Sequence, residues 1–242
     1  MSFSELKHYS NTFGPIYGTE DFGVYLYALI KMRKIATVLE YGTGLGVSAF
    51  WCAQAVKENG VGLVHTIDDG SDWPTNLLRE ELRDHRHLRH QEYVQKKAIE
   101  LSVSTHLVIH EHKIDFAKRY TDAPIGLVFL DYDHGVVNLI KFMAAVLPKM
   151  ETNGFIFIDG ASCFLPTYWM FKDMLAVLNT GRVPAALLEH AEDELLLKEY
   201  VAKSHFTLTH NIERKDRKQN NTMCIQITDL DILPYDRIHI RI

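Results

Sequence analysis

The fold is decided by the stretch Thr37-Val-Leu-Glu-Tyr-Gly-Thr-Gly-Leu-Gly46, an apolar run followed by an acid and three glycines at alternate positions. The apolar residues 37–39 predict a buried strand, and the apolar spacing after Leu45 predicts a helix. Glycines between a strand and a helix let the backbone turn tightly and approach a ligand closely. We therefore expect a nucleotide-type binding turn here.

Two cofactor classes use such a turn, and the residue after the third glycine helps to separate them. The dinucleotide fingerprint needs a small residue at position 47, where this chain has Val47. The spacing Glu-x-Gly-x-Gly-x-Gly from Glu40 instead resembles motif I of the class I S-adenosylmethionine-dependent methyltransferases. This resemblance implies that the cofactor is bound by residues of the turn, namely Glu40, Gly42, Thr43, Gly44 and Gly46.

An acid follows the next predicted strand, which spans residues 62–67. Asp68 ends this strand at the distance from the glycines where a Rossmann-like unit places its ribose-binding acid. In the family that the turn resembles, this position binds both ribose hydroxyls, and Asp69 is the second choice for the role. The alternative is an ordinary turn, because Asp, Gly and Ser are turn formers.

The composition is that of a globular protein. The 242 residues are 47% hydrophobic and 24% charged, with a net charge of −5. Negative charge argues against a general nucleic-acid surface, so we expect a small-molecule substrate. The sequence shows no membrane span and no apolar signal core, from which we expect a cytoplasmic protein. The separated Cys52, Cys163 and Cys224 indicate packing residues, and not a disulfide framework or a zinc site.

Predicted strands alternate with predicted helices through most of the chain. Further strands are expected at residues 106–110, 125–131 and 154–159, and two more, at 205–210 and 223–227, flank a polar turn. The alternation predicts an α/β fold, a Rossmann-like, doubly wound and mostly parallel seven-stranded sheet. The last two strands form the C-terminal antiparallel hairpin that the methyltransferase resemblance also implies.

The expected helices span residues 21–32, 45–56, 75–101, 136–150, 167–178 and 185–202. The helix at 75–101 is long and polar, and it carries His85, His87 and His90. These histidines do not have the spacing of a metal site, so we expect them on a solvated face. His110 and His112 follow a later strand and are expected to line the cleft as polar side chains.

The tip of the fourth strand reads Asp131-Tyr-Asp133-His134. This segment resembles the D-x-D-H segment of small-molecule O-methyltransferases of the macrolide-sugar and rhamnosyl type. The resemblance implies that Asp131 contacts cofactor or metal and that His134 is the general base. A histidine suits this role because its ordinary pKa near 6.5 lets it accept a hydroxyl proton around neutral pH. The alternative is that the acid only caps the next helix.

A magnesium site is a second implication of the same resemblance. Asp131 and Asp159 end neighbouring predicted strands and would give Mg²⁺ two hard oxygen ligands. Metal-dependent members usually carry another acid or amide after the fifth strand, whereas this chain has Gly160. Either Asp133 or water replaces the missing ligand, or His134 acts without a metal ion.

Three functions remain open from the sequence. The first is a methyltransferase that acts on the hydroxyl of a small molecule, and the others are an NAD(P)-dependent oxidoreductase and a non-catalytic S-adenosylmethionine-binding protein. We expect a single domain over residues 1–242, in which an arm and helix at 1–36 cover the site and the core spans 37–230. The tail at 231–242 alternates apolar and charged residues, which favours an edge strand that pairs with a second copy in a homodimer.

Overall fold

A computed structural model describes residues 3–13, 20–133, 135–161, 165–212 and 221–230. The strands form a seven-stranded sheet in the order β3-β2-β1-β4-β5-β7-β6, which confirms the predicted fold class. The chain divides into two compact units, one of Met1–Asp115 with Tyr120–Tyr132 and the other of Phe116–Arg119 with Asp133–Ile242. The single domain expected from the sequence stays a prediction.

The first unit is built on parallel strands that are buried on both faces. Every residue of β1 and β4 is buried, which explains why both read as unbroken apolar runs apart from Glu40. β1 pairs with β2 on one side and with β4 on the other, and β2 pairs with β3. The bounds are β1 Thr37–Tyr41, β2 Leu63–Asp68, β3 Leu107–Glu111 and β4 Ile125–Leu130.

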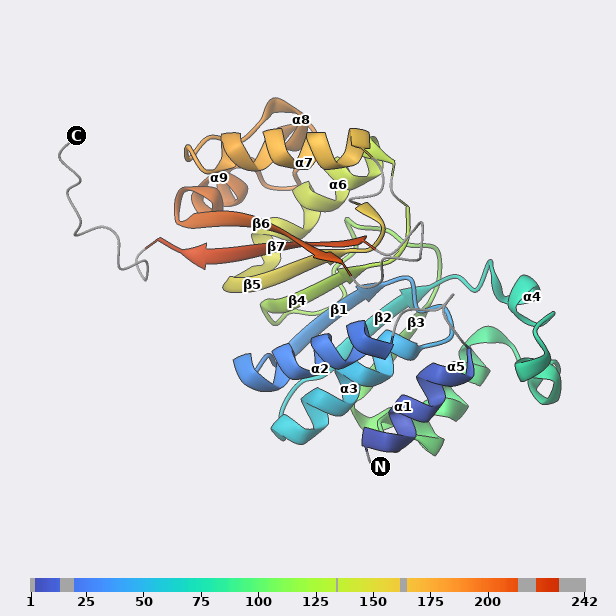
Figure 1. Ribbon diagram of the computed structural model, residues 1–242. Coiled ribbons are helices and arrows are strands. Elements are labelled where there is room, and N and C mark those ends of the chain that lie inside the picture. Colours follow the sequence, from blue (N-terminus) through green and yellow to red (C-terminus); the bar gives the residue numbers. More distant parts are fainter. Residues whose placement is uncertain (1–2, 14–19, 134, 162–164, 213–220, 231–242) are drawn as a thin grey trace. The chain divides into compact units, whose positions relative to one another are not determined.

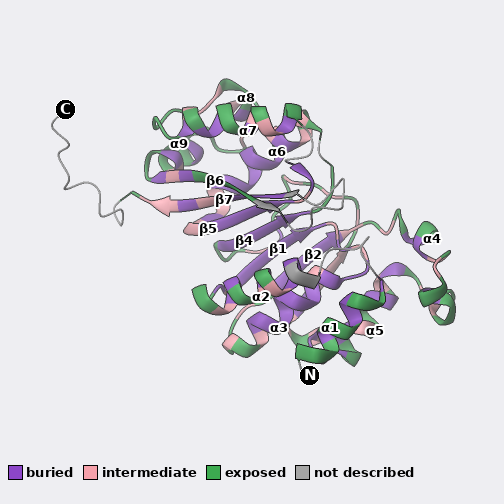
Figure 2. Ribbon diagram, viewed as in Figure 1, coloured by how far each residue is buried: buried purple, intermediate pink, exposed green. Residues whose placement is uncertain are grey.

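Helices α1, α2, α3 and α5 lie on one face of these four strands (Figure 1). Their buried sides face the sheet and one another, while their outer sides are exposed (Figure 2). α3 is buried along most of its length, and Phe50 and Trp51 are both fully enclosed. The bounds are α1 Phe3–Thr12, α2 Glu20–Arg33, α3 Val47–Asn59 and α5 His90–Glu100.

Helix α1 was not expected from the sequence, and it is tied to α3 by buried polar contacts. The Tyr9 hydroxyl donates to the Leu45 carbonyl at 2.6 Å and lies 3.0 Å from the Tyr93 hydroxyl. The Trp51 indole N–H donates to Ser10 Oγ at 2.8 Å. Because buried polar groups need such partners, these contacts fix the position of α1 against the start of α3.

The single long helix predicted at residues 75–101 is wrong. The segment forms α4 (Trp73–Asn76), a 3₁₀ helix η2 (Glu80–His85) and then α5. Pro74 fits only the first turn of a helix, which places a helix start there. The charged residues that follow have no apolar stripe to bury, so packing does not favour a continuous helix through them. A further 3₁₀ turn, η3 (Ser104–His106), precedes β3.

The second unit contains the antiparallel hairpin. β7 pairs antiparallel with both β5 and β6, as predicted for the C-terminal strands. The predicted helix at 136–150 ends early because Pro148 starts a 3₁₀ turn and Met150 already belongs to β5. The predicted helix at 185–202 is divided into α8 and α9. The bounds are α6 Val136–Val146, η4 Leu147–Lys149, β5 Met150–Ile158, α7 Leu165–Leu178, α8 Ala185–Leu188, α9 Glu194–Ala202, β6 Ser204–Ile212 and β7 Asn221–Asp229.

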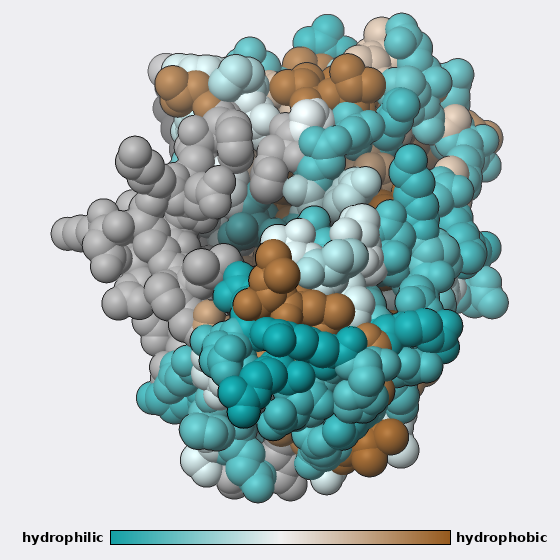
Figure 3. Space-filling view, turned by 90° about the vertical axis from the view of Figure 1, so that its right-hand side faces the viewer, coloured by the Kyte–Doolittle hydropathy of each residue, from teal (hydrophilic) through white to brown (hydrophobic). Residues whose placement is uncertain are grey.

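The surface drawn in Figure 3 is mostly hydrophilic, with separate hydrophobic groups between the polar ones. Within the described ranges, no helix combines the length and the apolar character needed to cross a membrane. Cys52 and Cys224 are buried, in agreement with a packing role, whereas Cys163 lies outside the described residues. The predicted dimer-forming tail at 231–242 also lies outside them.

Candidate active site

The glycine turn has the backbone geometry that its sequence predicts. Gly42, Gly44 and Gly46 have φ angles of 97°, 49° and 82°, a region that other residues rarely adopt. A Cβ atom on Gly42 would lie 2.0 Å from the carbonyl oxygen of Asp131. Gly42 is therefore required both by its φ angle and by the close approach of the β4 backbone.

Glu40 is held inside the unit by hydroxyl groups. Its side chain is 1% exposed, and its two carboxylate oxygens accept hydrogen bonds of 2.5 Å from Ser48 and Thr66. The Thr43 hydroxyl lies 2.6 Å from that of Thr66 and extends the chain of contacts into the turn. Burial raises the pKa of Glu40 from its ordinary value of 4.5 to about 7. The predicted contact of Glu40 with the cofactor stays a prediction.

Asp68 joins the two turns that surround the predicted ribose site. One carboxylate oxygen accepts the Gly44 N–H at 3.0 Å, and the other accepts the Gly70 N–H at 2.7 Å. The residue is half-buried, and each carboxylate oxygen keeps a further lone pair that can accept a hydrogen bond. Asp69 instead accepts the Ser71 N–H at 2.9 Å, and hydrogen bonds from the side chain and then the backbone of Ser71 lower the pKa of its carboxyl group. Asp68 is therefore the residue of this pair that is tied to the glycine turn.

His90 also contacts the turn, although the spacing of the histidines predicted that it lies on a solvated face. Its side chain is 4% exposed, and its Nε2 lies 2.7 Å from the Gly44 carbonyl oxygen. The solvated face predicted for this residue is wrong, because helix α5 begins at His90 and turns it inward. His85 is half-buried and His87 is exposed. No spacing in the sequence would have indicated this contact, since residues 44 and 90 belong to separate elements.

A third group of polar rings lies on β2, β3 and the chain after β3. The rings of His65 and His110 stack at 5.5 Å, with Nδ1 and Nε2 3.2 Å apart. The Tyr120 ring stacks on His112 at 5.5 Å. His110 and His112 therefore contact neighbouring rings, while the cleft lining predicted for them stays a prediction.

The tip of β4 is more open than the turn. Asp131, Tyr132 and Asp133 are all exposed. The Asp131 backbone N–H donates to the Tyr41 carbonyl at 2.9 Å, which places its main chain beside the glycine turn. In the second unit, the Asp133 carboxylate accepts hydrogen bonds from the Gly135 N–H at 2.7 Å and from the Asn138 amide. His134 lies outside the described residues.

Asp159 and Asp133, two of the residues predicted to bind Mg²⁺, have hydrogen-bond partners within the second unit. Asp159 follows β5 and accepts a hydrogen bond of 3.0 Å from the Thr222 hydroxyl. The Asp133 carboxylate, the proposed replacement ligand, is already held by Gly135 and Asn138. Nowhere in the described ranges do three or more His, Cys, Asp or Glu side chains form a group that could hold a metal ion. The described part of the chain therefore gives no support for a magnesium site, and the ligand roles of Asp131 and Asp159 stay predictions.

Fold and turn together define an α/β protein with a nucleotide-type binding turn at the carboxyl end of its first strand. A family model described as a methyltransferase domain matches residues 39–161, which is half of the chain and includes both the turn and the β4 tip. The chain therefore belongs to this methyltransferase domain family. No curated protein matches the sequence.

Solved structures of methyltransferases share the fold. The O-methyltransferase TomG from Streptomyces achromogenes, described in complex with SAM, is 14% identical with a TM-score of 0.57, and the match covers 94% of this chain and 91% of TomG. The SAH-bound methyltransferase PaMTH1 from Podospora anserina is 12% identical with a TM-score of 0.56, covering 93% and 87%. An O-methyltransferase from Bacillus cereus in complex with SAH is 13% identical with a TM-score of 0.51, covering 92% and 88%. These similarities support the fold.

Proposed function

We propose that this protein transfers a methyl group from S-adenosylmethionine to a hydroxyl group of a small molecule. The observation that carries the proposal is the joined cradle of Asp68, Gly44 and Gly70 in a chain of the methyltransferase family. The O-methyltransferases among the similar structures support oxygen as the acceptor atom. The negative net charge of −5 supports a small acceptor over a nucleic acid.

The cofactor half of the reaction is assigned to the turn. In this proposal Glu40 and Asp68 bind the donor, with Asp68 on the ribose hydroxyls. Backbone groups of the turn come close to it at Gly42, Thr43, Gly44 and Gly46. S-adenosylmethionine supplies an activated methyl group on a sulfonium, so the protein has little covalent chemistry to do. Its tasks are to align the acceptor oxygen with the methyl carbon, to exclude water and to take up a proton.

The acceptor half is assigned to the tip of β4. The acceptor oxygen forms a bond to the methyl carbon while the carbon–sulfur bond breaks and its electron pair stays on sulfur. The proton of the acceptor hydroxyl passes to His134, which we propose as the general base, with Asp131 next to the donor. The products are the methyl ether and S-adenosylhomocysteine. The resemblance of residues 131–134 to the macrolide-sugar and rhamnosyl enzymes supports a sugar or phenolic acceptor.

The first test is thermal unfolding of the protein with S-adenosylmethionine, S-adenosylhomocysteine, NAD and NADP. A ligand at one hundred times its dissociation constant stabilises a fold by about 2.7 kcal/mol, which is a readable shift. We expect stabilisation by the two adenosyl compounds alone. Stabilisation by a nicotinamide cofactor alone would replace this proposal with the oxidoreductase.

The second test measures release of S-adenosylhomocysteine with panels of sugars, phenols and matched amines. We expect release that depends on a hydroxyl compound, with the methyl group found on oxygen by mass spectrometry. Methylation of the amines instead would move the acceptor atom to nitrogen. Cofactor binding without any acceptor-dependent release would favour the non-catalytic binding protein.

A further inference from the structure

We infer that His90 is a positioning residue that holds the glycine turn in its cofactor-binding conformation. This inference rests on the proposed binding of S-adenosylmethionine, and it adds a residue that neither motif of the sequence contains. A carbonyl oxygen only accepts hydrogen bonds, so the 2.7 Å contact requires that His90 Nε2 carries a hydrogen and donates it to Gly44. The N–H group of Gly44 donates a second hydrogen bond, to the Asp68 carboxylate.

The His90 ring fills the space between the two turns of the cradle. A Cβ atom on Gly70 would lie 3.0 Å from the Cβ of His90, so the second turn packs directly on this side chain. The ring of Trp73 lies 5.7 Å from the His90 ring on another side. His90 therefore contacts both glycines whose N–H groups bind Asp68, and it couples their positions.

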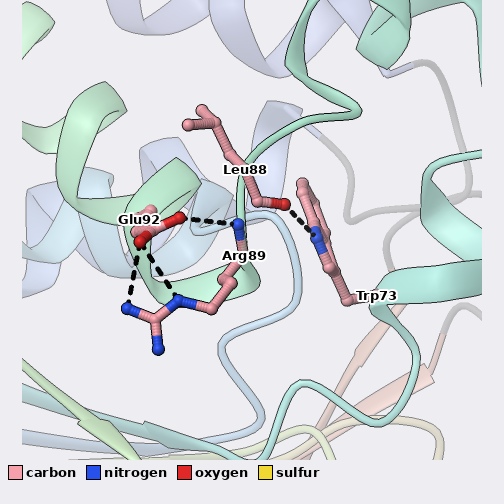
Figure 4. Close-up of polar contacts among 4 residues, drawn as sticks. All are labelled: Trp73, Leu88, Arg89 and Glu92. Atoms are coloured by element: carbon pink, nitrogen blue, oxygen red, sulfur yellow. Dashed lines mark hydrogen bonds and ion pairs between the residues drawn. The ribbon is translucent and has the colours of Figure 1, made fainter.

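The start of α5, which carries His90, is anchored independently of the turn. The Trp73 indole N–H donates to the Leu88 carbonyl at 2.9 Å, and the Arg89 backbone N–H donates to Glu92 at 2.9 Å (Figure 4). The second contact caps the first turn of α5. One turn further along, Tyr93 is bound to Tyr9 of α1. These contacts make the helix start a fixed support from which His90 reaches the glycine turn.

The Nδ1 atom of His90 is buried and has no hydrogen-bond partner within the described residues. Burying an acceptor without a partner costs free energy, so a side chain that does so is expected to have a compensating role. The hydrogen bond to Gly44 is such a role. Gly44 has a φ of 49° and no side chain, and the contact with His90 restricts the rotation of its carbonyl group. A turn that is not held before binding must be ordered by the cofactor, which weakens affinity.

The test measures the dissociation constant of S-adenosylhomocysteine by calorimetry for wild type and four variants. His90→Phe keeps the ring volume and removes the donor, while His90→Gln keeps an N–H near the position of Nε2. His90→Asn carries the same amide as His90→Gln on a shorter side chain, which does not reach Gly44. The matched control is His85→Phe, because His85 also has a buried Nδ1 without a partner and contacts Tyr93, but not the turn.

We expect His90→Phe and His90→Asn to weaken binding about tenfold, while His90→Gln and His85→Phe stay within about twofold of wild type. In turnover, the same loss is expected in KM for S-adenosylmethionine, with kcat at saturation unchanged. If His90→Phe does not fold, the Gln and Asn pair decides the question. Equal affinities of those two variants, with wild type binding the cofactor, overturn the role of His90 alone. A wild-type protein that binds neither adenosyl compound overturns this inference together with the proposed function.

Discussion

The glycine turn and the tip of β4 differ in how firmly the fold holds them. Around the turn, Glu40 accepts hydrogen bonds from Ser48 and Thr66, and Asp68 accepts one from Gly44, which is 24 residues away in sequence, besides a local one from Gly70. At the tip, Asp131 is exposed and the contacts described for Asp133 are made to residues close to it in sequence. The difference indicates that the glycine turn is held more firmly than the described residues at the tip of β4. In the proposed reaction the turn binds the donor and the tip faces the acceptor, so the donor side would be the more rigid of the two.

The largest loss of activity is expected when the proposed base is removed. We expect His134→Ala to lower kcat by about 10²- to 10⁴-fold because proton removal in the transition state is lost. The dissociation constant for S-adenosylhomocysteine should change little, since His134 belongs to the acceptor side. The control is His87→Ala at an exposed histidine. Equal losses of turnover and of cofactor affinity would remove the assignment as base.

A methyl group on Gly42 tests how tightly the turn is packed. The added carbon would meet the Asp131 carbonyl at 2.0 Å, so we expect Gly42→Ala to destabilise the fold by at least about 3 kcal/mol in urea unfolding and to weaken cofactor binding. Gly60→Ala is the matched control. Gly60 has a φ of 77° and no atom within 4 Å of an added carbon. It should lose only about 1 kcal/mol from backbone strain. Equal losses in both variants would show that the φ angle alone matters.

Glu40 gives the turn a dependence on pH. Its pKa is about 7 in the folded protein against an ordinary value of 4.5, so the folded state binds the proton more tightly than the unfolded state. The stabilisation from the protonated group is complete below pH 4.5 and is lost as the pH rises to about 7. We expect Glu40→Gln to remove this loss, a difference of about 3 kcal/mol across the window by order of magnitude.

The measurement is urea unfolding of wild type and Glu40→Gln at a series of pH values. Thr66→Val provides a second arm, because the Thr66 hydroxyl bonds to Glu40 and lowers its pKa. Removing that hydroxyl should move the window to higher pH. Parallel stability curves for wild type and Glu40→Gln would contradict the raised pKa.

The contact of α1 with the turn predicts a smaller effect. Tyr9→Phe leaves the Leu45 carbonyl and the Tyr93 hydroxyl without their partner, so we expect a loss of about 2 kcal/mol of unfolding free energy. Tyr93→Phe keeps the bond between Tyr9 and Leu45 and should lose about 1 kcal/mol. Chemical denaturation measures both variants. A larger loss for Tyr93→Phe would show that the bond to Leu45 is not the important one.

The smallest effect is expected from chelation. Because the described side chains form no set of metal ligands, we expect the enzyme to keep more than about half of its activity in EDTA. The assay compares untreated protein, chelated protein and chelated protein with added Mg²⁺. A loss of activity that Mg²⁺ restores would revive the site predicted from Asp131 and Asp159.

The sequence predicts those parts of the molecule whose structure depends on residues close together along the chain. The strand before the glycines and the antiparallel hairpin are confirmed because their patterns are local. The helix at 75–101 is wrong because its many charged residues resemble an exposed helix, although Pro74 and the lack of an apolar stripe divide it. Helix α1 was missed because its buried face is short, with only Leu6, Tyr9 and Ser10 enclosed.

The same limit applies to the site. The sequence singled out Asp68 because its distance from Gly44 along the chain is typical of this fold, and the structure joins it to the turn, while its ribose-binding role stays a prediction. The partners of Glu40 and the contact of His90 with Gly44 could not be predicted, since they depend on how α3 and α5 pack on the sheet.

The intrinsic tryptophan fluorescence of the protein reports the attachment of α1 to α3. Trp51 is 0% exposed, its indole bonds to Ser10, and its ring lies 4.9 Å from that of Phe3. Release of α1 would expose this indole to water and shift its fluorescence emission to longer wavelength. The other two tryptophans give a background signal: Trp169 is 51% exposed, and Trp73 is 7% exposed with its indole bonded to Leu88. Detachment of the N-terminal helix can therefore be followed without a label, separately from unfolding of the whole chain.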